Sequence, residues 1–327
     1  MTRGTAFSRR AALSAGAAGF VALVAPNAGH AVEPATSAAA PEFTGIDAWL
    51  NTPPLTMAAL RGRPVLVNFW THSCINCQRT LPILSGWHDG HGPQGLAVVG
   101  VHSPEFGFER RRDSVARAVE RQGLRYAVAL DGRHLTWRAY GNRFWPAFYL
   151  VDRRGRIVDR QFGEDGMAPT DRAIRRLLGT DLPLVEAVMP AGDAPQSPEM
   201  YLGRRRVAHL ANPALRAAGA VDHALPSTLP PDSFALGGAW SIGEETATLV
   251  RGPGVLRVHA RARRIHVVAG SRAPMDVNLA LDGTPRPAVT IDETLLYTLI
   301  DDAAAGWHVL VIAIPAAGLE AYALTFG

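Results

Sequence analysis

The stretch Val65-Leu-Val-Asn-Phe-Trp-Thr-His-Ser-Cys-Ile-Asn-Cys77 decides the fold of this chain. Its first half, Val65 to Trp70, is a short and almost wholly apolar run, which predicts a buried strand. The residues from Ile75 to Trp87 then follow a helical pattern. A Cys-x-x-Cys pair placed between a strand and a helix is typical of a redox-active dithiol, and this pair contains both cysteines of the chain.

The two cysteines are expected to have different tasks. Cys74 lies at the predicted helix N-terminus, where unpaired backbone N–H groups and the helix dipole stabilise a thiolate. Such a position lowers a thiol pKa from about 8.5 into the range of roughly 3.5–7.5. We therefore predict Cys74 as the nucleophile and Cys77 as the buried resolving thiol, which attacks a mixed disulfide formed on Cys74. Metal binding is the weaker interpretation, because a closed zinc site needs four ligands and His72 offers only a third. We expect no cofactor besides the disulfide itself.

The elements around the dithiol alternate between strand and helix patterns. Further strands are predicted at 96–102, 126–130, 147–151 and 157–162, and further helices at 109–122 and 170–178. Asp152–Gly155 has the composition of a hairpin turn. This order predicts one mixed sheet covered by helices, an α/β domain over residues 42–180.

The second half of the chain changes character. Residues 181–231 are rich in proline and alanine and are predicted as a bridge along the first domain, or as a disordered linker. From residue 232 to 327 the apolar period becomes two, as in Leu256, Val258, Ala260 and Ala262. Short strands at near-regular spacing without helices predict an all-β sandwich over 232–327.

The N-terminal residues have the pattern of an export signal. Arg9 and Arg10 precede an uncharged, apolar run from residue 11 to 25, which is short for a membrane span. Residues 1–31 are therefore predicted as a cleaved twin-arginine (Tat) signal peptide, with 32–41 as a flexible lead-in and an uncleaved anchor as the alternative. Export would place a soluble mature chain outside the cytoplasm, where cysteines are readily oxidised.

Charge gives no sign of a polyanion as partner. The sequence has 327 residues, and all 33 basic residues are arginine. Without the three arginines of residues 1–31, 30 arginines remain against 29 acidic residues, a balance of +1. Nucleic-acid binding is therefore not expected.

The residues around the dithiol resemble the thioredoxin superfamily. The resemblance lies in Val67-Asn-Phe-Trp-Thr71, in the spacing of the two cysteines and in Pro82. Pro146 matches the family's cis-proline loop, which lies against the Cys-x-x-Cys and presents backbone to the substrate. An ordinary trans proline at the start of a strand is the alternative for Pro146.

A closer resemblance covers residues 42–327. Gly100–Phe106, Gly163–Asp165 and Ser197–Gly203 resemble the exported C-terminal region of DipZ-type thiol:disulfide interchange proteins. This implies a TlpA/ResA-like thioredoxin domain followed by a β-sandwich like a carbohydrate-binding module. It also implies a periplasmic or extracytoplasmic thiol-disulfide oxidoreductase that acts on cysteine-containing proteins. TlpA/ResA-like relatives mostly reduce, including apocytochrome c thiols in cytochrome c maturation. DipZ-type proteins carry a polytopic membrane domain where this chain has a signal peptide, so a reductase here would need a separate membrane electron donor.

Two positions near the thiols depart from these families. Asn68 stands where thioredoxins keep an aspartate, and Thr80 stands where ResA-like proteins keep a glutamate. Because neither replacement can accept a proton, another group is expected to do so. Glu105 and Glu109 are the candidates, with solvated loop carboxylates as the alternative. His72 and His102 are weaker candidates, since buried histidines are more often structural.

Aromatic residues suggest two binding surfaces. Trp70 and Trp145, with Pro146, would form an apolar docking surface for a partner's cysteine segment, although Trp145 could equally pack into the core. In the second half, four aromatics could form a platform for cell-wall glycan, with core packing as the alternative: Trp240, Trp307, Tyr297 and Tyr322.

The leading hypothesis is thus a thiol-disulfide oxidoreductase, and two others stay open. Thr71-x-x-Cys74 resembles the Thr-x-x-Cys of peroxiredoxins, which suggests a thiol peroxidase. The proline that precedes this threonine in peroxiredoxins is absent, since the position holds Val67. The third hypothesis is a cell-surface glycan-binding protein in which the Cys-x-x-Cys is a redox switch.

Overall fold

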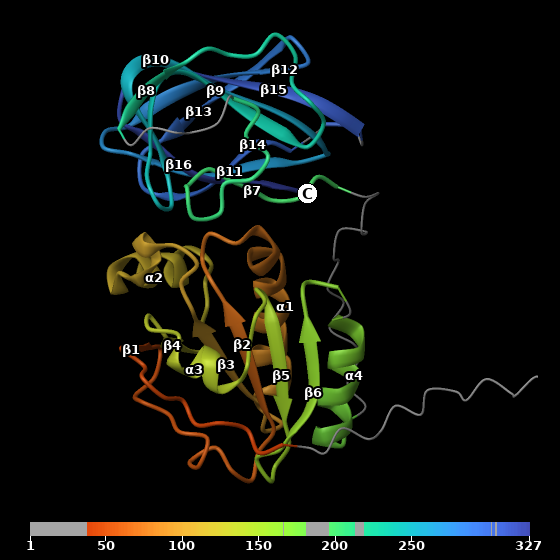
Figure 1. The fold of residues 1–327 in the computed structure, drawn as a ribbon. Helices are drawn as coiled ribbons and strands as arrows, with labels where there is room; N and C mark the ends of the chain where they lie inside the picture. Colours follow the sequence, from red (N-terminus) through yellow and green to blue (C-terminus); the bar gives the residue numbers. More distant parts are fainter. Residues whose placement is uncertain (1–37, 166, 181–195, 213–218, 302, 305) are drawn as a thin grey trace, which may run out of the picture. The chain divides into compact units, whose positions relative to one another are not determined.

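The computed structural model describes residues 38–165, 167–180, 196–212, 219–301, 303–304 and 306–327 (Figure 1). The predicted signal peptide, most of the lead-in and parts of the predicted bridge lie outside the described residues. Among the residues that the structure describes, none of the helices has the length and apolar character needed to cross a membrane.

The first domain is built on a six-stranded mixed sheet in the order β1-β4-β3-β2-β5-β6. The central strands β2, β3 and β4 are parallel, and β1, β5 and β6 run antiparallel to their neighbours. The bounds are Ala48–Leu50 (β1), Val65–Trp70 (β2), Ala97–His102 (β3), Ala127–Leu130 (β4), Ala147–Val151 (β5) and Ile157–Phe162 (β6). All residues of β2 and β5 are buried, which explains their continuous apolar sequences.

Helices and loops cover both faces of this sheet. The helices α1 (Ile75–His91), α2 (Arg112–Arg121) and α4 (Met167–Leu178) share one core with the sheet. The short helix α3 (Leu135–Ala139) follows β4 (Figure 1), and a second core on the opposite face includes the segment before β2. This α/β arrangement confirms the predicted fold of the domain.

The helix predicted over residues 109–122 is wrong at its start. A 3₁₀ helix, η1 (Gly107–Arg110), comes first, and α2 begins only at Arg112. The reason is Glu109, whose side chain turns inward and accepts hydrogen bonds from the backbone N–H groups of Glu105 and Phe106. An inward carboxylate bound to its own loop cannot also lie on the solvent face of an amphipathic helix.

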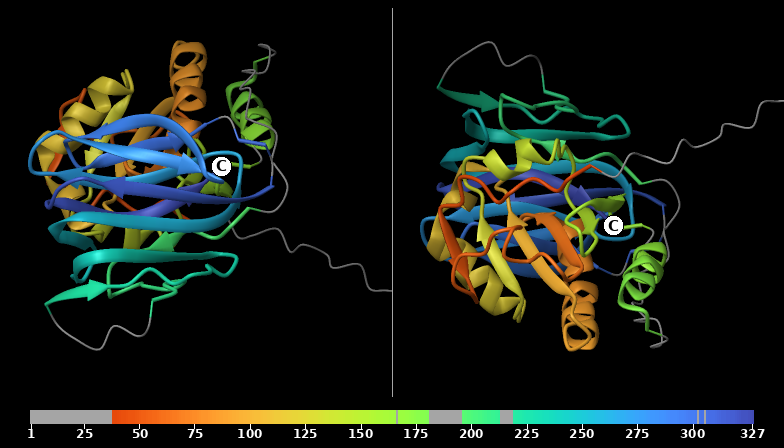
Figure 2. Two further views of the ribbon diagram at one scale, coloured as in Figure 1. Left: turned by 90° about the horizontal axis from the view of Figure 1, so that it is seen from above. Right: turned by 90° about the horizontal axis from the view of Figure 1, so that it is seen from below.

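The second domain is all-β, as predicted. Ten strands are joined by hydrogen bonds into one sheet, whose long central strand β10 pairs with β9, β15 and β16. Figure 2 shows these strands from above and from below. The bounds are Met200–Tyr201 (β7), Ala220–His223 (β8), Ser233–Ile242 (β9), Ala247–Ala262 (β10), Ile265–Ser271 (β11), Met275–Leu281 (β12), Thr284–Ile291 (β13), Leu295–Ile300 (β14), Gly306–Ile314 (β15) and Leu319–Phe326 (β16).

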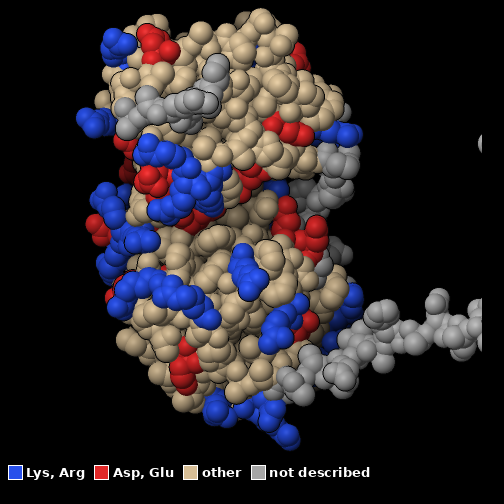
Figure 3. All heavy atoms as spheres, viewed as in Figure 1, with Lys and Arg blue, Asp and Glu red and all other residues tan. Residues whose placement is uncertain are grey.

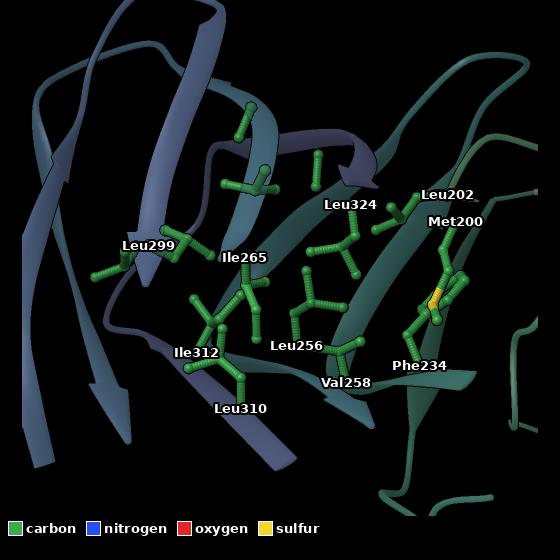
Figure 4. Packing of buried hydrophobic residues seen from close by; sticks show 14 of the residues in the cluster. Met200, Leu202, Phe234, Leu256, Val258, Ile265, Leu299, Leu310, Ile312 and Leu324 are labelled. Atoms are coloured by element: carbon green, nitrogen blue, oxygen red, sulfur yellow. The ribbon is translucent and has the colours of Figure 1, made fainter. Parts of the chain in front are cut away.

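One hydrophobic core holds the β domain together. Apolar side chains from many strands meet there, among them Leu256, Val258, Leu310 and Ile312 (Figure 4). The alternation along β10 is as predicted, since the residues Leu256, Val258, Ala260 and Ala262 are buried. Asp282 and Gly283 form the hairpin turn between β12 and β13, and both have the positive φ angles, 50° and 80°, that such a turn requires.

Part of the predicted bridge belongs to the β domain. Within residues 181–231, strand β7 pairs with β16 and strand β8 pairs with β9. Met200 and Leu202 are fully buried in the β core (Figure 4). Strands of two and four residues are too short to produce a period in the sequence, which is why the pattern did not reveal them.

Candidate functional site

The two cysteines lie at the start of α1 with unequal access to solvent. Cys74 is the N-cap of the helix and is partly exposed, whereas Cys77 is fully buried. Both are free thiols, and the backbone N–H of Cys77 donates a 3.3 Å hydrogen bond to Sγ of Cys74. An external disulfide can therefore meet Cys74 first, with Cys77 directly behind it in the same turn.

The pKa of Cys74 departs from the expectation for a helix N-terminus. A side-chain hydrogen bond with Cys77 is the largest cause, and with burial and the charges of Cys77 and Glu105 it raises this pKa well above its ordinary value. The backbone N–H of Cys77 acts in the opposite direction. The lowered pKa expected for Cys74 at the helix N-terminus is therefore not found.

Cys74 opens into a cavity of about 450 Å³. Its wall includes Trp145 and Glu105 from the α/β domain and Glu199, Tyr201, Arg206 and Phe326 from the chain that follows. Acidic and basic side chains lie next to each other across the middle of the face in view in Figure 3. The site is thus a charged cavity to which the C-terminal part of the chain contributes as well.

The residues of the predicted docking surface behave differently from one another. The Trp145–Pro146 peptide bond is cis, as the resemblance implied. Trp145 lines the cavity, packs on Trp137 with ring centroids 4.3 Å apart, and donates from Nε1 to the backbone oxygen of Ser103 at 2.9 Å. The expectation for Trp70 is wrong, because its side chain is 0% exposed and belongs to the core between the sheet and the helices.

Glu109 is neither a solvated loop carboxylate nor a proton carrier. It is 0% exposed, and its Oε1 accepts from the hydroxyls of Thr71 and Ser73 at 2.6 and 2.7 Å and from Nδ1 of His72 at 2.9 Å. Burial alone would raise the pKa of this carboxyl group. The hydrogen bond and charge of His72, the charge of His102 and the Thr71 hydroxyl outweigh burial and hold the pKa far below its ordinary value. Glu109 therefore stays ionised and fixes the segment that leads into Cys74.

His72 and His102 belong to the same buried cluster. The second nitrogen of His72, Nε2, lies 2.8 Å from Oγ of Ser114, so both ring nitrogens are engaged away from the cavity. Burial, followed by the charge of His72, lowers the pKa of His102 to about 3. His72, His102 and Glu109 each have one atom that could bind a metal ion, and these three atoms lie within 4.8 Å of one another. Hydrogen bonds among these residues and with Thr71, Ser73 and Ser114 explain why the three side chains are close together, as a buried polar core.

The two departures from the family pattern supply no proton acceptor for Cys77. Thr80 donates its hydroxyl to the backbone oxygen of Cys77 at 2.8 Å. Asn68 donates weakly to backbone oxygens, and its Oδ1 has no hydrogen-bond partner among the described residues. The hydroxyl of Tyr126 likewise has no hydrogen-bond partner among the described residues. Its pKa is raised by burial and by the charge of Cys77.

Glu105 is the predicted proton carrier that does share the cavity with Cys74. Its side chain is 8% exposed, and its Oε1 accepts from Nη1 of Arg206 and from the hydroxyl of Tyr201, both at 2.7 Å. Burial raises the pKa of Glu105, while Arg206 and Tyr201 act against that shift. No role was predicted for Tyr201 and Arg206 from the sequence. The only signal was their place in and next to the Ser197–Gly203 motif.

The predicted glycan platform does not form. Trp240 is 0% exposed and donates from Nε1 to the backbone oxygen of Gly237 at 2.9 Å, so it is a core residue. Trp307 is 45% exposed, and Tyr322 is buried against Phe106 and Phe108. The hydroxyl of Tyr297 is bound by the loop at Asp292. These four aromatics therefore do not form a common exposed surface.

The strand–Cys-x-x-Cys–helix unit within this six-stranded α/β fold defines a thioredoxin-like domain. Residues 36–160 match the AhpC/TSA family, and residues 197–327 match the family described as thioredoxin like C-terminal domain.

The chain is DipZ-like. It is 32% identical over 299 residues to the protein DipZ of Mycobacterium tuberculosis and to that of Mycobacterium bovis, which is 88% of this chain and 43% of those proteins. It therefore spans less than half of their length. The thiol-disulfide oxidoreductase YkuV of Bacillus subtilis is 28% identical over 138 residues, 42% of this chain and 93% of that protein. The solution structure of a thioredoxin-like protein in the oxidized form covers 44% of this chain and 96% of its own, with 28% identity and a TM-score of 0.41.

Proposed function

We propose that this protein is an exported thiol-disulfide oxidoreductase that exchanges disulfides with the cysteines of other proteins. Cys74 is the nucleophile, and Cys77 is the resolving thiol. The observation that carries the proposal is the partly exposed Cys74 at a cavity wall, with the buried Cys77 one helical turn behind it. The printed names of two relatives, the thiol-disulfide oxidoreductases YkuV and ResA, support the same chemistry.

The exchange proceeds in two balanced steps. The Cys74 thiolate attacks one sulfur of a substrate disulfide, a new sulfur–sulfur bond forms, and the other substrate sulfur leaves with the electron pair and takes up a proton. The Cys77 thiol then loses its proton and attacks Sγ of Cys74, which releases the second substrate sulfur as a thiol. The protein ends as a Cys74–Cys77 disulfide, and the two protons of its thiols reside on the substrate. The same steps in reverse oxidise a substrate dithiol.

Residues around Cys74 fit the cysteine segment of a polypeptide. Trp145 offers a half-buried apolar surface, and the exposed Phe144 stands next to it on the cavity wall. Arg79 and Glu164 form an ion pair of 2.9 Å on the same wall. Apolar surface with charged groups at its edge is typical of sites that hold a protein segment. Export and a separate membrane electron donor are further parts of this proposal and depend on the sequence pattern of residues 1–31.

A thiol peroxidase is the second candidate, because residues 36–160 match the AhpC/TSA family. Its chemistry would require the Thr71 hydroxyl to polarise a peroxide beside Cys74. That hydroxyl is fully buried and donates to Glu109 at 2.6 Å. The geometry therefore favours exchange with disulfides.

The reduction potential of the cysteine pair tests the proposal. Equilibration in glutathione or dithiothreitol buffers should give one reversible two-electron transition, absent from Cys74→Ser and Cys77→Ser. Dithiols that reduce protein disulfides have potentials around −270 mV, and strongly oxidising ones around −120 mV. Cys77→Ser should also accumulate a mixed disulfide with a cysteine peptide. Rapid hydrogen peroxide consumption without a reversible transition would instead support the peroxidase.

A further inference from the structure

A chain of three side chains connects solvent to the cavity in front of Cys74. The hydroxyl oxygen of Tyr201 lies 2.7 Å from Oε1 of Glu105 and 2.6 Å from Oε2 of Glu199. Glu105 is almost buried, whereas Glu199 is exposed. All three residues line the cavity that contains Cys74, and the charge of Glu105 acts on the Cys74 thiol.

The two short contacts of the Tyr201 hydroxyl require a proton on one of the two carboxyl groups, Glu105 or Glu199. A tyrosine hydroxyl has one hydrogen, so it can donate to one carboxylate only. Its second short contact is a hydrogen bond only if the other carboxyl group is protonated and donates to it. Glu105 also accepts from Arg206 at 2.7 Å, which favours its ionised form. The protonated group is therefore Glu199.

The electrostatics of Glu199 agree with this assignment. Although the residue as a whole is exposed, its carboxyl group lies against Tyr201. The loss of solvent there, followed by the charge of Glu105, raises the pKa of Glu199 to about 7, against the effects of Tyr201 and Arg206. The other charged groups of the cavity wall are the paired Arg79 and Glu164, and Arg143.

We propose that Glu199, Tyr201 and Glu105 form a proton relay that protonates the sulfur leaving the substrate when Cys74 attacks a disulfide. The proton of Glu199 passes to the Tyr201 oxygen, the Tyr201 proton passes to Glu105, and Glu105 delivers a proton across the cavity to the leaving sulfur. Glu199 is then reprotonated by solvent. In the oxidising direction the relay runs backwards and takes up the proton. This inference rests on the proposed exchange at Cys74, and it makes the C-terminal part of the chain a participant in that reaction.

Two small disulfide substrates with different leaving groups distinguish proton delivery from the other steps of the exchange. Oxidised glutathione releases an alkyl thiolate, which is a poor leaving group without a proton. 5,5′-Dithiobis(2-nitrobenzoate) releases an acidic aromatic thiolate, which leaves readily without one. The experiment measures the rate at which the reduced full chain attacks each disulfide between pH 5.5 and 9. The ratio of the two rates cancels the ionisation of Cys74, which both reactions share.

In the wild-type protein the ratio of glutathione to aromatic rate should fall as the pH rises through about 7, because Glu199 loses its proton there. Glu199→Gln and Tyr201→Phe should lower the glutathione rate at pH 6.5 by about tenfold and abolish the fall. A positioned acid contributes roughly 10²–10⁴-fold, which solvent water replaces in part. In either variant the aromatic rate should fall much less than the glutathione rate, because the aromatic thiolate leaves without a delivered proton. Glu244→Gln, an exposed glutamate paired with Arg204, is the matched control and should behave as the wild type.

Other outcomes have separate meanings. Equal loss of both rates would show a structural effect and overturn the relay, as would a Glu199→Gln variant with the wild-type ratio at every pH. Loss in Tyr201→Phe alone would make Tyr201 the donor without Glu199 and would also overturn it. If the wild-type protein reduced neither disulfide, the proposed exchange itself would have failed.

Discussion

Nδ1 of His72 lies 2.9 Å from Oε1 of Glu109, and the two side chains are only 3% and 0% exposed. His72 and Ser73 directly precede Cys74, and the backbone N–H and the hydroxyl of Ser73 both donate to Glu109. One carboxylate from the loop after β3 thus holds the loop after β2 in place. The segment that leads into Cys74 is therefore anchored by a buried polar cluster as well as by the helix that follows it.

Glu109→Gln should destabilise the protein by about 3 kcal/mol, the lower end of what removing one partner of a buried ion pair costs. The amide keeps the size of the side chain but turns one of its acceptor groups into a donor facing other donors. Urea unfolding of both proteins measures the difference. Glu293→Gln is the control, because Glu293 is half-exposed in its pair with Arg117 and should change stability by less than about 1 kcal/mol. A loss of similar size in both variants would contradict the anchoring role.

Stability should fall on mild acidification because of His102. Its pKa is lowered from 6.5 to about 3 by burial and by the charge of His72. The unfolded chain therefore binds a proton below about pH 6.5 that the folded protein binds only near pH 3. Each pH unit between those values removes up to about 1.4 kcal/mol.

His102→Gln should make the unfolding free energy depend less steeply on pH between 6 and 4.5, as measured by urea titrations at several pH values. His266, whose pKa burial lowers to about 4, contributes with the same sign in both proteins, so the difference isolates His102. The depressed pKa of Glu109 acts in a lower window: its stabilisation is complete above the unfolded pKa of about 4.3 and is lost only below it. Identical slopes in the wild type and His102→Gln would show that His102 titrates normally.

Trp240→Ala should destabilise the β domain by about 3–5 kcal/mol, because it removes a fully buried indole from the core. Trp307→Ala, at the exposed tryptophan of β15, should change stability by less than about 0.5 kcal/mol. Urea unfolding followed by circular dichroism compares the two. Equal effects would mean that Trp240 is not the core residue that its burial indicates.

The features that the sequence predicted correctly are those that depend on a local pattern of residues. The strand, dithiol and helix from Val65 to Trp87 follow from apolar runs and cysteine spacing, and the alternation along β10 follows from its period of two. It could not predict which carboxylate lies near Cys74. Glu105 and Glu109 are four residues apart in one loop, but one faces the cavity and the other faces the buried hydroxyls and histidines. That difference depends on residues distant in sequence, above all Tyr201 and Arg206, whose contacts with Glu105 no local pattern encodes.

The contacts of Trp145 are compatible both with substrate binding and with packing in the protein core. A substitution of Trp145 can distinguish these two roles. Its ring lines the cavity but also stacks on Trp137 and binds the backbone of Ser103. If Trp145 holds substrate, Trp145→Ala should lower kcat/KM for a protein disulfide such as that of insulin by about tenfold, roughly 1.4 kcal/mol of lost contact, without changing the reduction potential.

The comparison substrate for Trp145→Ala is oxidised glutathione, which is too small to use an extended docking surface. A docking residue predicts a loss with insulin and little change with glutathione. A packing residue predicts equal loss with both substrates, together with a lower free energy of unfolding. Trp307→Ala removes an equally large ring outside the cavity lining and should leave both rates unchanged. Because the Trp145 indole is only half-buried, we expect the larger effect on insulin reduction, which would assign Trp145 to substrate binding.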